Sequence, residues 1–207
     1  MTPDLLAHIR TCLAPEPVAA TDEDDFREGK ADGLAEAALI PSAVLFPLAP
    51  RAQGLQALFT RRTDHLRDHP GQISFPGGRM EQGDATPAHT ALREAEEEIG
   101  LARNLPQILG YLPAYRTATG FLIYPVVALL LPPFTLTLDA FEVAEAFEIP
   151  LTRLLDPANQ RRESIFYKGK TRRYHVIDCE SETQPRHIWG ATAGMILMLA
   201  GRLAKRG

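Results

Sequence analysis

The stretch "TPAHTALREAEEEIG" (86–100) predicts a complete helix, because the sequence marks both of its ends and one of its faces. Thr86 can cap the N-terminus, and Pro87 then takes the first helical position, where its missing N–H costs nothing. Gly100 can end the helix in a left-handed conformation. We therefore expect an amphipathic helix over 87–99. Its apolar face recurs at three- and four-residue steps and consists of Ala91, Leu92, Ala95 and Ile99.

Four glutamates crowd the last turns of this helix: Glu94, Glu96, Glu97 and Glu98. Each helical residue turns by about 100°, so Glu97 and Glu98 lie within about 60° of Glu94, whereas Glu96 points nearly the opposite way. Like charges at this spacing repel by a few tenths of a kcal/mol per pair. Three converging carboxylates suit Mg²⁺, which takes oxygen ligands and is often shared with substrate phosphates. The alternative is a solvated helix face, and the glutamates alone leave both open.

The segment before the helix favours a binding site. "FPGGRMEQGD" (75–84) is a strand end, two glycines and a polar loop that leads into the helix. Glycine lets the backbone approach a ligand closely. The loop would therefore bring backbone carbonyls and amides near the carboxylates. Arg93 can hydrogen-bond the loop or a glutamate and so fix its rotamer.

The segment from Gly78 to Leu101 resembles the Nudix box, whose pattern is G, five residues, E, seven residues and then R-E-U-x-E-E-x-G-U, where U is apolar. "REAEEEIGL" (93–101) matches the second half at every defined position if Ala95 is taken as apolar. The chain departs twice from the first half. Asp84 replaces the first glutamate, and eight residues rather than seven follow it.

This resemblance implies an α/β (α+β) fold, the α/β/α sandwich with a mixed central sheet of Nudix proteins. It also implies hydrolysis of a diphosphate linked to another moiety, with Mg²⁺ or Mn²⁺ as cofactor. The positions that match the family's metal ligands and catalytic residues are Glu94 and Glu98, with Glu97 close by as a further ligand or as the base. The backbone of Gly77 or Gly78 is expected near the metal or phosphate.

The stretch "LFTRRTDHLRDHPGQISFPGG" (58–78) is similar to the signature of the coenzyme A pyrophosphatase subfamily, L-L-T-x-R-[SA], three residues, R, three residues, G, three residues, F-P-G-G. Phe59 and Thr63 are mild departures. The change at Asp84 and the extra residue also look like this subfamily. The residues in register are Leu58, Thr60, Arg62, Arg67, Gly71, Phe75, Pro76, Gly77 and Gly78. The substrate-binding residues that follow are Arg61, Arg62, Arg67, Gly71, Gly77 and Gly78.

The chemistry of these residues agrees with that substrate. Coenzyme A carries a diphosphate and a separate 3′-phosphate, and arginine suits bidentate phosphate contacts. The expected products are 3′,5′-ADP and 4′-phosphopantetheine. The alternative substrates are ADP-ribose, a dinucleotide or nucleoside triphosphates, and the remaining alternatives are a silent Nudix regulator and an incidental acidic helix. Glu142, Glu145 and Glu148 are candidate bases outside the box, although each also suits a structural role.

Composition is typical of a soluble globular protein of 207 residues, with 45% hydrophobic and 23% charged residues. A net charge of -4 gives no support for nucleic acid or membrane partners, and the apolar run 121–134 is too short to span a bilayer. The start of the chain lacks a secretory signal, so we expect a cytoplasmic protein. Cys12 and Cys179 match no metal or redox spacing and are expected to be free thiols. A homodimer is plausible.

We expect one domain, with an N-terminal helix and arm over 1–36 and the Nudix domain over 37–207. The expected helices span 4–13 and 190–207, with one helical turn at 151–155. A loop is expected over 63–72 and a hairpin turn around Gly169. The expected strands span 37–48, 54–62, 106–114, 121–131, 144–149, 163–168 and 171–178.

Overall fold

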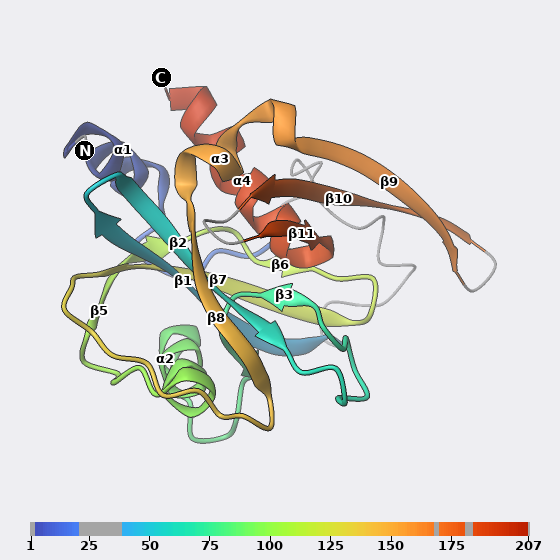
Figure 1. The fold of residues 1–207 in the computed structure, drawn as a ribbon, viewed down its shortest axis with the longest axis horizontal. Coiled ribbons are helices and arrows are strands. Elements are labelled where there is room, and N and C mark those ends of the chain that lie inside the picture. The colour runs from blue at the N-terminus through green and yellow to red at the C-terminus, as the bar shows by residue number, and fades with distance from the viewer. Residues whose placement is uncertain (1–2, 21–38, 168–169, 181–183, 207) are drawn as a thin grey trace.

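A mixed eight-stranded sheet forms the centre of the computed structural model, which describes residues 3–20, 39–167, 170–180 and 184–206 (Figure 1). β1 and β7 pair in parallel, while the other strand pairs are antiparallel. The strands are β1 (Ile40–Arg51), β2 (Gly54–Arg62), β3 (Ile73–Ser74), β4 (Gly77–Arg79), β5 (Pro106–Tyr111), β6 (Tyr115–Arg116), β7 (Phe121–Leu130) and β8 (Val143–Pro150).

Helices cover both faces of this sheet (Figure 1). α2 (Pro87–Ile99) lies on one face. The other face carries α1 (Pro3–Cys12), α3 (Leu151–Leu155) and α4 (Gly190–Arg206). A second, three-stranded sheet lies beside α4 and consists of β9 (Gln160–Tyr167), β10 (Lys170–Glu180) and β11 (Pro185–Trp189), preceded by a 3₁₀ turn at Pro157–Asn159. The predicted sandwich with a mixed sheet is confirmed.

β1 is buried on both faces, and its alternating side chains supply both halves of the core. Ala43 and Leu45 belong to the cluster under α2, whereas Phe46 and Leu48 belong to the larger cluster under α4. This division follows from the two-residue period of a strand. β1 therefore fixes the two helical layers relative to each other.

One edge of β1 changes partner along its length. Its C-terminal half pairs with β2, from Leu48 to Arg51, and its N-terminal half pairs with β4, from Ser42 to Val44. β2 has by then diverged to pair with β3 and β8. The three-residue strand β4 thus carries the two glycines into the sheet directly beside α2.

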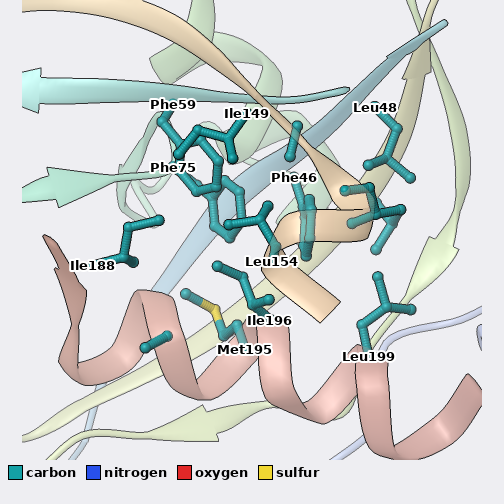
Figure 2. Close-up of a cluster of buried hydrophobic side chains, with 14 of the residues drawn as sticks. Phe46, Leu48, Phe59, Phe75, Ile149, Leu154, Ile188, Met195, Ile196 and Leu199 are labelled. Atoms are coloured by element: carbon teal, nitrogen blue, oxygen red, sulfur yellow. The ribbon is translucent and has the colours of Figure 1, made fainter. Parts of the chain in front are cut away.

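Phe75 anchors the segment that leads into these glycines. Its ring stacks on Phe46, with centroids 4.1 Å apart, and on Phe59, at 4.8 Å (Figure 2). The side chain is almost fully buried. The next residue, Pro76, accepts a 2.8 Å hydrogen bond from the backbone N–H of Leu45. The core therefore sets the position of the glycine strand.

Several boundaries differ from the predicted ones. β5 ends at Tyr111 rather than continuing to 114: Leu112 still bonds the Pro125 carbonyl on β7, but Ala114 bonds Val18 of the N-terminal segment. β11 was not predicted, since its five residues begin with proline and carry a weak apolar pattern. Both cysteines are free and buried. Residues 21–38 and the turn at Gly169 lie outside the described residues, and the proposed domain division stays a prediction.

Replacement of Phe75 by alanine should destabilise the protein by about 3–5 kcal/mol, because it removes a buried ring that contacts two other phenylalanines. Chemical denaturation measures this change. Phe166→Ala is the matched control, since its ring is 73% exposed, and it should change stability by less than about 0.5 kcal/mol. Equal losses in the two variants would contradict the anchoring role of Phe75.

Candidate active site

α2 forms as the sequence predicts, with both ends fixed by local contacts. Thr86 Oγ1 accepts a 3.2 Å hydrogen bond from the backbone N–H of His89. Gly100 has φ 65° and ψ 20°, and its N–H bonds the carbonyl of Glu96 at 2.9 Å. A side chain at Gly100 would also meet Thr137. The helix register is therefore set, and with it the direction of every glutamate.

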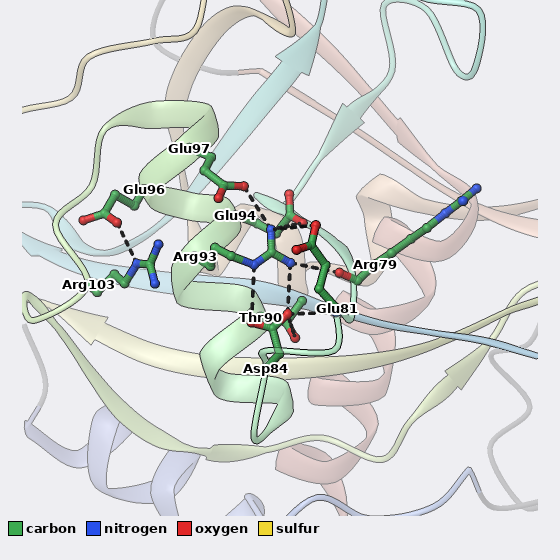
Figure 3. A network of polar contacts seen from close by, with 9 residues as sticks. All are labelled: Arg79, Glu81, Asp84, Thr90, Arg93, Glu94, Glu96, Glu97 and Arg103. Carbon is green, nitrogen blue, oxygen red and sulfur yellow. Dashed lines mark hydrogen bonds and ion pairs between the residues drawn. The ribbon is translucent and has the colours of Figure 1, made fainter.

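The four glutamates lie at different depths. Glu98 is buried, with 7% exposure, and the side chain of Glu94 is 17% exposed. The side chain of Glu97 is 53% exposed at the rim. Glu96 points away and forms an ion pair with Arg103, whose Nε donates to the Glu96 carboxylate at 2.6 Å (Figure 3). The predicted separation of Glu96 from the other three is confirmed, but the strip is graded from a buried to an exposed carboxylate.

Gly77 and Gly78 lie against the two inner carboxylates. A Cβ atom built on Gly78 would collide with the carboxylate of Glu94, and one built on Gly77 would collide with the backbone of Ala43. The Gly77 backbone also hydrogen-bonds Glu98. Residues with side chains cannot occupy these positions without displacing β1 or the carboxylates, which gives the paired glycines of the sequence a physical reason.

Arg93 connects the loop, the helix and two of the glutamates (Figure 3). Its guanidinium donates to Asp84 Oδ1 at 3.3 Å and Oδ2 at 3.0 Å, and also to Glu94 and Glu97, both at 2.9 Å. It further donates to the carbonyl of Arg79 at 3.0 Å, while the Arg79 side chain points away. The prediction that Arg93 bonds the loop and a glutamate is confirmed.

Asp84, which replaces the glutamate of the usual box, is the residue through which the loop binds Arg93. Hydrogen bonds from Arg93 lower the pKa of its carboxyl to about 2, aided by the Glu81 backbone and by the Thr90 hydroxyl at 2.9 Å. Asp84 is therefore ionised at any neutral pH, and so is Arg93, whose pKa these contacts raise. The shorter aspartate reaches Arg93 across a loop that is one residue longer than the usual box.

The surroundings of the two inner carboxylates, Glu94 and Glu98, disfavour their ionised forms. Burial, then repulsion from Glu94, raises the pKa of Glu98 to about 8, and burial also raises the pKa of Glu94. Within the described residues, Glu98 Oε2 is buried and has no hydrogen-bond partner. A buried carboxylate oxygen without a partner is costly unless a proton or a cation meets it. The donor set is hard oxygen, which fits Mg²⁺ or Mn²⁺.

The carboxylates do not enclose an ion by themselves. Across 3–20, 39–167, 170–180 and 184–206, no three His, Cys, Asp or Glu side chains are gathered closely enough to do so. Arg93 occupies the side of Glu94 that faces Glu97. A shell completed by water and substrate oxygens is usual for Mg²⁺. Glu94, Glu98 and Glu97 are thus the residues that would hold a metal together with its substrate.

Of the three candidate bases outside the box, the structure brings one to the carboxylates. The charge of Glu142, just before β8, raises the pKa of both Glu94 and Glu98. Glu145 is bound by Arg186 at 2.6 Å and 2.9 Å, and Glu148 is bound by Arg51. The sequence could not rank these residues, because the ranking depends on partners that come from distant strands.

The predicted substrate residues separate into an inner and an outer group. Arg62 lies near Glu98, whose pKa its charge lowers, and its buried Nε has no partner among the residues described. Arg61 instead pairs with Asp64 at 3.5 Å and with Glu145 at 3.8 Å. Arg67 is exposed. Gly71 has φ 68° and makes a turn in the same loop, facing Asp64.

A cavity of about 390 Å³ opens beside Gly77, Gly78 and Arg62. Its lining comes from β1, the end of β2 and the loop after it, β3, β4, the β6–β7 turn, β7, β11 and the start of α4. Sequence reasoning missed most of these residues, because single positions on many separate segments carry no local signal. The missed hydroxyl and aromatic lining residues are Ser42, Ser74, Thr117, Thr119, Phe121, Trp189 and Thr192.

The NUDIX domain model matches residues 39–169, which is more than half of the chain, and the chain belongs to the Nudix family. Its relatives include the uncharacterized Nudix hydrolase NudL of Enterobacter sp. (strain 638), 39% identical over 160 residues that cover 77% of this chain and 80% of that relative. NudL of Escherichia coli (strain K12) is 37% identical over the same shares. The chain is therefore a Nudix hydrolase by family.

Solved structures are also similar to parts of this chain, at low sequence identity. The Ap4A hydrolase of C. elegans has a TM-score of 0.47 and 18% identity, over 54% of this chain and 80% of that chain. A MutT/nudix family protein from Enterococcus faecalis also has a TM-score of 0.47, at 15% identity, over 81% of this chain and 62% of that chain.

No helix in the described part of the chain is long and apolar enough to cross a membrane.

Replacement of Gly78 by alanine should abolish most hydrolysis, because the added methyl group would displace the carboxylate of Glu94. Gly83→Ala is the matched control in the same loop, since a Cβ there would meet nothing within 4 Å. Steady-state assays of both variants with Mg²⁺, after circular dichroism confirms folding, measure the effect. A Gly78→Ala enzyme as active as Gly83→Ala would contradict the placement of Glu94.

Proposed function

We propose that the chain is a divalent-metal-dependent pyrophosphatase that hydrolyses the diphosphate of coenzyme A, or of its acyl or oxidised forms, to 3′,5′-ADP and 4′-phosphopantetheine. The observation that carries the reaction class is the partnerless buried oxygen of Glu98 beside Gly77 and Gly78. The assignment of coenzyme A as substrate rests on the motif over 58–78, which ends at Gly77 and Gly78 of β4.

Mg²⁺ or Mn²⁺ bound at Glu94, Glu98 and Glu97 would neutralise diphosphate charge and lower the pKa of an attacking water. The residues of the chain itself would position the diphosphate. Gly77 and Gly78 bring the backbone of β4 directly against the carboxylates, and both also line the cavity. Phosphoryl transfer depends mainly on such positioning and on electrostatic stabilisation.

Arg62 is the cation that supports the diphosphate. It lines the cavity together with Gly77, and its buried Nε–H has no partner among the described residues and can donate. A buried guanidinium with an unused donor suits a phosphate oxygen. Arg62 thus binds the substrate while its charge also steadies the ionised form of Glu98.

We assign to Glu142 the role of accepting the proton of the attacking water, because its charge acts on both Glu94 and Glu98. Its turn is held from both sides, because Asp139 N–H bonds the Glu98 carbonyl at 2.9 Å and Thr63 N–H bonds the Glu142 carbonyl at 3.0 Å. Thr63 Oγ1 also bonds the Phe141 carbonyl at 2.8 Å. A base must lie within reach of the water that it activates, and these contacts hold the backbone of the turn that carries Glu142.

Coenzyme A should be hydrolysed faster than ADP-ribose, NADH or a nucleoside triphosphate at equal concentration. Only coenzyme A among these combines a diphosphate with a ribose 3′-phosphate, which the arginine-bearing loop can contact. Mass spectrometry of the products, in water enriched in heavy oxygen and with Mg²⁺ or Mn²⁺, measures both the substrate and the attacked phosphorus. Preference for ADP-ribose would overturn the substrate, and no metal-dependent hydrolysis of any diphosphate would overturn the reaction class.

A further inference from the structure

The cavity beside the glycine strand lies on the α4 side of the sheet, opposite α2. Ser42 and Val44 line it from β1, while the alternating residues Ala43 and Leu45 face α2. Its opposite wall comes from Trp189 at the end of β11 and from the first turns of α4. The glycines Gly77 and Gly78 line the same cavity and also touch the carboxylates. A substrate whose diphosphate lies at the glycines therefore extends one of its two halves into this space.

The chemistry of the lining is mainly neutral. Five residues bring hydroxyl groups, and several more are apolar. Two arginines line it: the charge of Arg62 acts on Glu98, and Arg79 places its guanidinium carbon 5.6 Å from the Phe121 ring centroid. Exposed Asp68 adds a negative charge. The hydroxyl-bearing lining residues are Ser42, Ser74, Thr117, Thr119 and Thr192.

One hydroxyl in the β1 wall of the cavity, that of Ser42, is buried without a hydrogen-bond partner among the described residues. The residue is only 5% exposed, and its Oγ has no hydrogen-bond partner in the part of the chain that is described. In the sheet register Ser42 lies between Arg79 on β4 and Ile123 on β7, and both of these residues also line the cavity. A buried hydroxyl left unsatisfied costs about 1–3 kcal/mol. An amide or hydroxyl of a bound ligand would satisfy it.

We propose that this cavity binds the uncharged half of the substrate, an amide- and hydroxyl-bearing chain of the pantetheine class, and that the phosphorylated nucleoside stays outside it. The inference rests on the proposed function. The volume of about 390 Å³ is near the lower end of ligand cavities, about 300–1,000 Å³, so it holds one half of a molecule as large as coenzyme A.

The free polar group of the lining favours the uncharged half. Its threonine hydroxyls are already engaged, since Thr117 bonds Thr119 and the backbone of Phe121, and Thr192 bonds the carbonyl of Ile73. The hydroxyl of Ser42 has no partner among the described residues and matches an amide of the neutral chain. Arg67, which the motif assigns to a phosphate, is exposed and lies outside the lining. Ser42 is therefore a specificity-determining residue for the non-nucleotide half.

Two variants test this assignment. Ser42→Ala removes the partnerless hydroxyl, and Ala191→Phe fills the cavity from a partly buried position at the start of α4. Ser164→Ala is the matched control, because Ser164 is exposed on β9 and outside the cavity. Isothermal titration in Mg²⁺ measures the affinity of the full-length protein for 4′-phosphopantetheine and, separately, for 3′,5′-ADP. Thermal unfolding confirms that each variant is folded.

Ser42→Ala should weaken binding of 4′-phosphopantetheine by about three- to tenfold, the value of one hydrogen bond, and Ala191→Phe should weaken it further. Both should leave the affinity for 3′,5′-ADP within about twofold, and Ser164→Ala should change neither. A loss confined to 3′,5′-ADP, or no loss in either variant, overturns this inference alone. Wild-type protein that neither hydrolyses coenzyme A nor binds either product overturns the proposed function and this inference with it.

Discussion

The contact between Arg93 and Asp84 determines how the loop between β4 and α2 packs against α2. Asp84 is ionised because Arg93 lowers its pKa to about 2, and Arg93 in turn reaches Glu94, Glu97 and the carbonyl of Arg79. The loop is thereby closed over the first turns of α2. The glycine strand, which enters this loop, is then held against Glu94 and Glu98 from one side while Phe75 fixes it in the core from the other.

This arrangement places two kinds of surface on either side of one short strand. On the α2 side, burial raises the pKa values of Glu94 and Glu98, and the charge of Glu94 raises that of Glu98 further, so the ionised carboxylates favour a divalent cation. On the α4 side, the same strand borders a cavity with a mostly neutral, hydroxyl-bearing lining. A diphosphate between a charged end and a neutral end fits both surfaces, with Arg62 joining them.

The sequence predicts well what depends on local contacts. The ends of α2 match to the residue, because Thr86, Pro87 and Gly100 act within one helical turn, and the 100° step separates Glu96 from its neighbours. It does not predict depth or pairing. The burial of Glu98, the nearness of Glu142 and the pairing of Arg61 with Glu145 all arise from strands far apart in the chain. Ser42 has no local signal at all, since only the fold shows that its hydroxyl is buried in the cavity lining without a partner among the described residues.

Binding of Mn²⁺ tests the central claim most directly, that Glu98 and its neighbours form a cation site. Electron paramagnetic resonance titration counts bound Mn²⁺ in the wild type, in Glu98→Gln and in Glu96→Gln, which changes the outward-facing glutamate paired with Arg103. A cation site at Glu98 predicts that Glu98→Gln loses Mn²⁺ binding and at least about 10²-fold of the hydrolysis rate, while Glu96→Gln keeps both. Unchanged Mn²⁺ binding and turnover in folded Glu98→Gln protein would contradict it.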